Sequence, residues 1–79
     1  MNNYERYVKV FKETFDIEET VLDDLKYQDI ESWDSVGHMG LIASIEEEFD
    51  IMMDTEDIID LSSFKKGIEI LSSKYDIEF

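Results

Sequence analysis

The stretch from Ser32 to Asp50 reads SWDSVGHMGLIASIEEEFD, and the rest of the chain is organised around it. Its apolar residues recur at steps of three and four, which is the period of one face of an α-helix. They are Met39, Ile42, Ile45 and Phe49, with Leu41 and Ala43 beside them. The pattern predicts an amphipathic helix of about four turns that begins near Ser35.

Ser35 stands at the expected start of this helix. Backbone N–H groups in the first turn of a helix have no partner within the helix, so an anionic group placed beside them is stabilised. Ser35 is therefore either a simple helix cap or the attachment point of a phosphorylated group. The stretch alone leaves both interpretations open.

The composition favours a single domain over residues 1–79. With 43% apolar residues the chain has enough material for one small core, and the absence of Cys excludes disulfides and thiolate metal sites. No run approaches the roughly 20 apolar residues of a membrane span. Charged residues within the first twelve positions interrupt the apolar core that a secretory signal needs. We expect a monomeric cytoplasmic protein.

The net charge of −14 argues against nucleic acid and anionic membranes as partners, because both attract Lys and Arg. The charge is also unevenly distributed. Between Tyr27 and Phe64 the chain has eleven Asp and Glu residues and no Lys or Arg. A negative field of this kind is suited to steering a basic protein partner, although a solvated surface that maintains solubility would look the same.

The residues before position 35 predict a first helix followed by a long loop. Asn2 or Asn3 is suited to cap a helix that ends near Phe15. Its apolar residues again recur at steps of three and four: Tyr4, Val8, Phe11 and Phe15, with Tyr7 alongside. Periodicity is weak over 16–34, where we expect a loop with a short helical turn within 20–25. Loops of this length in compact domains are often functional.

The residues after position 50 predict a short link and two more helices. The link, 50–54, is expected to turn three apolar side chains inward: Ile51, Met52 and Met53. A brief helix capped by Asp54 or Thr55 reaches Asp60, with core contacts from Ile58, Ile59 and Leu61. A last helix spans 64–74 with Phe64, Ile68 and Leu71 inward, and the tail, 76–79, is expected to fray. The sum is an all-α four-helix bundle with a long loop between helices one and two and a short third helix.

Two further kinds of chemistry fit the residues poorly. Ser35 and His38 would share a helix face, as a nucleophile and its base would. The strand and glycine that precede such a serine are missing, so we expect no enzyme and place His38 on the surface. The acids between 50 and 60 suggest a calcium loop, but Met52 and Thr55 stand where an oxygen ligand and a glycine are needed, so we expect no metal site.

The order of motifs resembles the acyl carrier protein family over most of the chain. The resemblance rests on Asp34-Ser35-Val36, then Glu46-Glu47-Glu48-Phe49-Asp50-Ile51, then the short helix over 54–61 and the apolar stripe over 64–71. It implies a four-helix bundle in which Ser35 receives 4′-phosphopantetheine from coenzyme A through a separate phosphopantetheinyl transferase. Asp34 would present Ser35, and acyl or aminoacyl groups would be carried as thioesters on the prosthetic thiol.

The same resemblance implies a surface that partner enzymes recognise, centred on the 35–49 helix. We assign to it Val36, Met39, Ala43, Glu46, Glu47, Met53 and Glu56. Its partners would be the transferase, an acyl- or aminoacyl-activating ligase, and downstream acyltransferases or synthases.

The run from Trp33 to Met39 differs from that of carriers of fatty acid biosynthesis, which have a small or polar residue before the Asp-Ser pair. It is similar to free-standing carriers of dedicated pathways, which handle modified sugars, aminoacyl groups or secondary metabolites. The alternative hypothesis is an acidic helical adaptor that binds a basic protein through the same helix without a prosthetic group.

Overall fold

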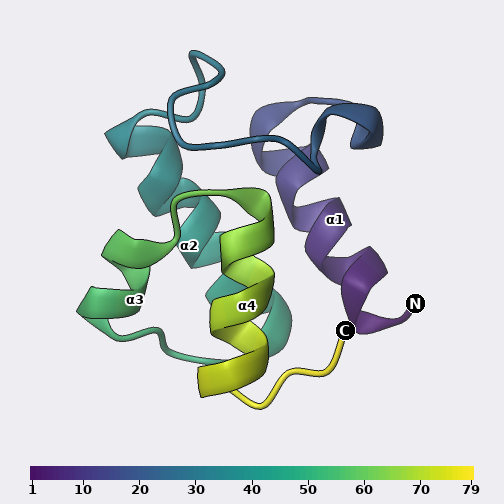
Figure 1. The fold of residues 1–79 in the computed structure, drawn as a ribbon, viewed down its shortest axis with the longest axis vertical. Coiled ribbons are helices and arrows are strands. Elements are labelled where there is room, and N and C mark those ends of the chain that lie inside the picture. Colours follow the sequence, from purple (N-terminus) through teal and green to yellow (C-terminus); the bar gives the residue numbers. More distant parts are fainter.

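Four helices and one short 3₁₀ turn make up the protein, whose computed structural model describes all residues from 1 to 79 (Figure 1). The elements are α1 (Asn3–Phe15), η1 (Glu19–Val21), α2 (Ser35–Phe49), α3 (Thr55–Asp60) and α4 (Phe64–Lys74). The predicted all-α fold, with its long α1–α2 loop and its short third helix, is confirmed. None of the helices combines the length and the apolar character needed to cross a membrane.

Helix α1 is fixed at both ends by its own sequence. Asn2 and Glu5 form a reciprocal capping box, in which each side chain accepts a hydrogen bond from the other residue's backbone N–H. Asp16 ends the helix in the left-handed conformation. Within the helix, the buried Tyr7 hydroxyl donates to the carbonyl of Phe64 at 2.8 Å, which ties α1 to α4. Burial also raises the pKa of Tyr7 well above its ordinary value.

A cluster of aromatic rings forms the centre of the core, and Trp33 from the loop belongs to it. The Trp33 side chain is fully buried, stacks on Phe15 with ring centroids 5.4 Å apart, and meets Phe11 edge-on at 5.5 Å. Phe11 in turn contacts Phe64 of α4 at 5.1 Å. The end of the long loop is therefore anchored in the core by its largest side chain, just before α2 begins.

The buried face of α2 is rotated from the one predicted. Leu41, Ile42 and Ile45 are its buried residues, whereas Met39, expected to face inward, is 55% exposed. His38 takes the inner position instead, because it lies three and four residues before Leu41 and Ile42 on the same helix face. The prediction for Met39 is wrong because the imidazole has a partner in the core.

Two other core predictions are wrong for a similar reason. In the link between α2 and α3 only Met53 is buried, while Met52 is 86% exposed, and on α3 the side chain of Ile59 is 72% exposed. Five link residues and a six-residue helix turn few side chains inward, and apolar composition alone does not identify which ones.

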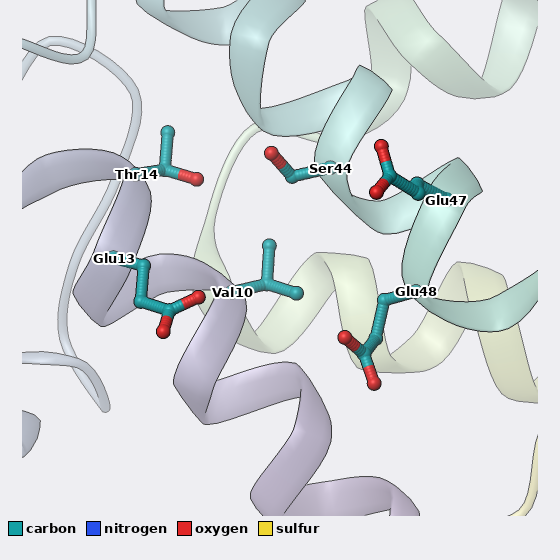
Figure 2. Close-up of a pocket in the computed structure, with 6 residues that line it drawn as sticks. All are labelled: Val10, Glu13, Thr14, Ser44, Glu47 and Glu48. Carbon is teal, nitrogen blue, oxygen red and sulfur yellow. The ribbon is translucent and has the colours of Figure 1, made fainter.

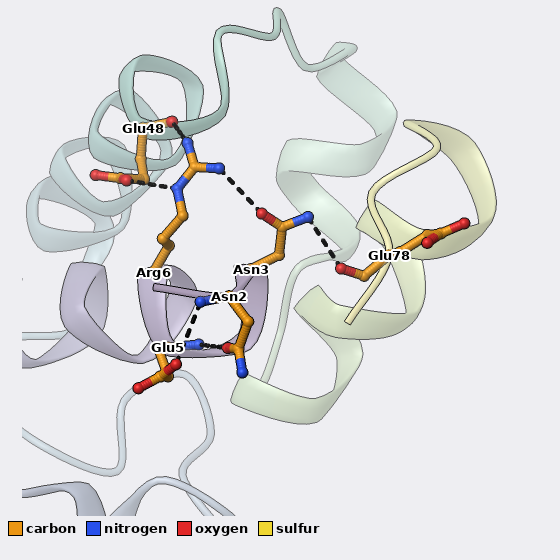
Figure 3. A network of polar contacts seen from close by, with 6 residues as sticks. All are labelled: Asn2, Asn3, Glu5, Arg6, Glu48 and Glu78. Atoms are coloured by element: carbon orange, nitrogen blue, oxygen red, sulfur yellow. Dashed lines mark hydrogen bonds and ion pairs between the residues drawn. The ribbon is translucent and has the colours of Figure 1, made fainter.

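The C-terminal tail, expected to fray, instead packs on α1. Ile77 is buried, and the Phe79 ring contacts Tyr7 and Phe49 at centroid distances of 5.5 and 6.4 Å. The Asn3 side chain donates to the carbonyl of Glu78 at 3.0 Å, so the two ends of the chain lie side by side (Figures 1 and 3).

Arg6 joins α1 to the C-terminal end of α2 (Figure 3). Its Nε lies 2.8 Å from a carboxylate oxygen of Glu48, a second guanidinium nitrogen donates to the Glu48 carbonyl, and the guanidinium lies over the ring of Phe49. The acid run at this helix end, unfavourable to the helix dipole, is thus partly compensated by a cation from the neighbouring helix.

Helix α3 is held to the end of α4 by a buried carboxylate that the sequence analysis did not single out. Asp57 is 2% exposed, and its two oxygens accept from Lys74 Nζ at 2.8 Å and from the Tyr75 hydroxyl at 2.6 Å. Tyr75 accepts in turn from the backbone N–H of Asp54 at 2.7 Å. These hydrogen bonds, that of Lys74 first, hold the pKa of Asp57 below its ordinary value, while Asp57 raises the pKa of Lys74.

Gly37 and Gly40 provide a matched pair for testing the start of α2. A methyl group on Gly37 would lie 1.8 Å from the carbonyl oxygen of Ser32, whereas one on Gly40 would meet nothing within 4 Å. We expect Gly40→Ala to stabilise the protein by up to about 1 kcal/mol through helix propensity. Gly37→Ala should destabilise it by about 1–3 kcal/mol, because the loop backbone must move. Urea denaturation measures both, and equal effects would contradict the close approach of the loop.

The Asp57 contacts predict a pH dependence of stability. Because the pKa of Asp57 is lowered in the folded state, its contribution is present above the ordinary carboxyl pKa and is lost as the pH falls through the lowered value. The difference in unfolding free energy between wild type and Asp57→Asn should therefore be largest near neutral pH and shrink below about pH 4. Asp23→Asn, on the exposed loop, is the control. A difference that stays constant with pH would contradict this role.

Candidate functional site

Ser35 is the first residue of α2 and its side chain is exposed. Asp34 precedes it as the N-cap and accepts a hydrogen bond from the Gly37 N–H at 2.8 Å, which fixes the backbone around the serine. The first turn contains no acidic residue. The hydroxyl therefore stands at a rigid, accessible helix N-terminus where a bound anion would be stabilised.

An apolar groove of about 370 Å³ begins at Ser35 and runs between α2 and α3. It is lined by Tyr27, Ser35, His38, Met39, Ile58, Ile59, Leu61 and Ser62. The exposed side chains of Met39 and Ile59, which core packing does not explain, thus form part of its walls. The groove places an apolar surface directly beside an exposed hydroxyl.

His38 lies in this groove, but both of its ring nitrogens already have partners. Trp33 Nε1–H donates to Nδ1 at 3.0 Å, so the proton of the neutral ring is on Nε2, which lies 2.7 Å from the carbonyl oxygen of Ile58 and donates to it. The ring edge of Tyr27 also packs against it, at 5.6 Å between centroids. An imidazole with both nitrogens engaged is poorly suited to act as a base for Ser35, so the hydrolase hypothesis loses support.

The residues assigned to partner recognition divide into exposed and buried ones. The exposed ones are Val36, Met39, Ala43, Glu47 and Glu56. Glu46 is half-buried, and its carboxylate accepts from the Met53 N–H at 2.8 Å, so it also fastens the link to α2. Met53 itself is buried and does not belong to this surface.

Met52, which was expected to turn inward, is the methionine of the link that reaches solvent. The sequence offered no signal for it, because two adjacent methionines in a short link have equal apolar character.

A second, polar groove of about 240 Å³ lies between α1 and α2 (Figure 2). Its lining consists of Val10, Glu13, Thr14, Ser44, Glu47 and Glu48. Carboxylates approach it from both helices, and one of them, Glu48, is already paired with Arg6. This groove adds to the negative field on the exposed side of α2 but lies away from Ser35.

Comparison with known proteins identifies related chains. The chain is 36% identical over 76 residues to the acyl carrier protein of Buchnera aphidicola subsp. Schizaphis graminum, covering 94% of this chain and 96% of that protein. It is 32% identical over 74 residues to the acyl carrier protein of Buchnera aphidicola subsp. Acyrthosiphon pisum, covering 92% of each. No family model and no solved structure matches it.

These relatives do not favour the adaptor hypothesis. Identity of this degree over nearly the whole of both chains places the protein in the acyl carrier protein family, whose members are carriers and not enzymes.

Proposed function

We propose that this acyl carrier holds its cargo on a 4′-phosphopantetheine arm attached to Ser35. Membership of the family implies this prosthetic group. The observation that supports Ser35 as its site is the exposed hydroxyl at the N-terminus of α2, beside an apolar groove. When bound, the group supplies a thiol for thioester chemistry, which this chain lacks because it has no Cys.

The residues around Ser35 fit a phosphodiester. The helix N-terminus faces the hydroxyl with its positive dipole end, and the first turn itself contains no acidic residue; the carboxylate at this end, that of the N-cap Asp34, is already bound by the Gly37 N–H. Asp34 directs its carboxylate to the Gly37 N–H, so it acts first as a cap that holds Ser35 in a fixed orientation. In our proposal this is how Asp34 presents Ser35 to a phosphopantetheinyl transferase.

The partner surface in this proposal combines apolar contacts with charge steering. Val36 is an exposed apolar side chain next to Ser35, and Met52 is another, which lies in the chain between the exposed acids Glu47 and Glu56. The transferase, an activating ligase and downstream acyltransferases would each bind here through basic surfaces. Steering raises the association rate while affinity stays modest, as a carrier that must leave each enzyme requires.

We further propose a monomeric, cytoplasmic carrier that serves a dedicated pathway. The net charge of −14 opposes self-association. The run from Trp33 to His38, which forms the bridge between the loop, α2 and α3, supports a specialised role. Membership of the family is also compatible with a role in fatty acid biosynthesis. Identification of the cargo would distinguish that role from a dedicated pathway.

Loading of Ser35 tests the attachment site. Incubation with coenzyme A and a broad-specificity phosphopantetheinyl transferase should add the mass of one phosphopantetheinyl group to the wild type and nothing to Ser35→Ala. Ser32→Ala, an exposed serine three residues earlier, is the matched control and should load normally. Loading of Ser35→Ala, or no loading of a folded wild type, would contradict the proposal.

Charge reversal at Glu47 tests the steering surface. Glu47 is exposed, so Glu47→Lys should leave the fold intact while slowing transferase association several-fold at low salt. The defect should diminish as the salt concentration rises, because the field is screened. Glu18→Lys makes the same change in charge on the α1–α2 loop and should have a smaller effect. Equal effects of the two reversals would argue against a localised surface on α2.

A further inference from the structure

We infer that His38 is a positioning residue for the loading of Ser35, because its imidazole fixes the first turn of α2 and so limits the directions that the serine hydroxyl can take. The inference rests on the proposed attachment at Ser35 and adds a residue to that site. The hydrogen bonds of the His38 ring go to Trp33 and Ile58 and not to Ser35, so His38 acts through the backbone. We call these two bonds the clamp.

The step that needs positioning is the attack of the Ser35 oxygen on coenzyme A. The oxygen forms a bond to the phosphorus that carries pantetheine, the pyrophosphate bond breaks, adenosine 3′,5′-bisphosphate leaves, and the hydroxyl proton passes to a base of the transferase. The attacking oxygen must lie in line with the bond that breaks, and alignment of this kind supplies much of the rate of such reactions. A hydroxyl on a fixed backbone is therefore transferred to faster than one on a backbone that samples several conformations.

The bond from Trp33 Nε1 to His38 Nδ1 spans Ser35. At 3.0 Å it joins the residue two positions before the serine to the residue three positions after it. Its Trp33 end is fixed, because the side chain is fully buried and the backbone is held as well. The Trp33 N–H donates to the Ile30 carbonyl at 3.1 Å, and the Trp33 carbonyl accepts from the Gln28 N–H at 3.0 Å. The first turn of α2 is thereby tied to the core.

The first turns of α2 are weak without this bond. Gly37 and Gly40 have low helix propensity, and helix ends fray more readily than helix centres. The local bonds, from the N–H groups of Gly37 and His38 to Asp34, fix these residues only relative to one another. A side-chain bond to the core, the one from Trp33 to His38, fixes them relative to the rest of the protein.

On its other side the imidazole is fixed to α3. Its Nε2 donates to the Ile58 carbonyl at 2.7 Å. The neighbouring Asp57 is held in turn by Lys74 Nζ at 2.8 Å and by the Tyr75 hydroxyl at 2.6 Å. Rotation of the ring would break both bonds of the clamp and leave the buried indole N–H without a partner, which is unfavourable. The clamp is therefore anchored at both ends.

The clamp and the steering surface act on different steps of loading. Glu47 and the other exposed acids of α2 govern association, because charge steering acts before contact. His38 is neutral in the clamp, since one ring nitrogen accepts and the other donates, and it governs the orientation of Ser35 after contact. Loss of the clamp should therefore lower the rate of transfer within the complex and leave formation of the complex nearly unchanged.

Single-turnover loading with excess transferase, followed by intact mass, separates these two steps. The maximal rate reports transfer within the complex, and the transferase concentration at half that rate reports binding. In His38→Ala we expect the maximal rate to fall about tenfold while the half-saturating concentration changes by less than about twofold. His38→Gln, whose amide offers one acceptor and one donor, should recover most of the rate. The loss should not change with salt, in contrast to that of Glu47→Lys.

A second readout follows the clamp itself. Exchange of the Trp33 indole N–H with solvent, measured by NMR, should be slow in the wild type and in His38→Gln and faster in His38→Ala. Trp33→Phe keeps a buried ring but removes the donor. It should lower the maximal rate as His38→Ala does, and it replaces that variant if His38→Ala does not fold. Val8→Ala, a core truncation on α1, controls for general loss of stability and should load at the wild-type rate.

Three outcomes would overturn the inference. They are a wild-type maximal rate in a folded His38→Ala or Trp33→Phe, an equal fall in Val8→Ala, and a His38→Gln variant that protects the indole N–H but loads slowly. Absence of a mass gain in the folded wild type would instead overturn the attachment at Ser35. Because the wild type is measured first, failure of the attachment site and failure of the clamp are distinguished.

Discussion

Burial of the Trp33 side chain is the constraint on which the rest of the structure depends. Removing a buried Trp side chain typically costs about 3–5 kcal/mol, a large part of the roughly 5–15 kcal/mol that stabilises a whole domain. Trp33 lies in a loop, so its burial also fixes the backbone immediately before Asp34 and Ser35. Because the indole N–H cannot remain unpaired in the core, it engages His38, and through His38 it positions α3. One side chain thus links the core, the start of α2 and the groove.

Two of the few cationic side chains in this acidic chain form ion pairs with carboxylates of α2 and α3. Arg6 pairs with Glu48 at the C-terminal end of α2, and Lys74 pairs with Asp57 on α3. Exposed pairs contribute little, but Arg6 also lies over the Phe49 ring, and Lys74 meets a carboxylate that is itself buried. These contacts reduce the mutual repulsion of the acidic residues between positions 27 and 64. They do not neutralise the outer surface of α2, where Glu47 remains exposed.

The helices could be predicted from the sequence because their signals are local. Asn2, one of the two residues expected to cap α1, does so through its side chain, and the apolar spacing predicted the approximate helix lengths. The cap of α2 is Asp34 and not Ser35, which the sequence analysis considered for that role. The burial of Asp57 and the exposure of Met52 depend on contacts with residues distant in sequence, such as Lys74 for Asp57, which periodicity does not report. For the site, Asp34 and Ser35 were recognisable from a short motif. His38 was not, because its role is set by Trp33 and Ile58 together.

The exposed apolar side chains near Ser35 are costly for an isolated small protein, and the charge of the chain explains how they are tolerated. Val36, Met39 and Ile59 are each at least 55% exposed, and together they form a surface that favours self-association. A net charge of −14 repels a second copy of the chain but attracts a basic partner. The same charges therefore suppress one association and promote another. This combination allows a carrier to display an apolar contact surface around its attachment site while remaining free between enzymes.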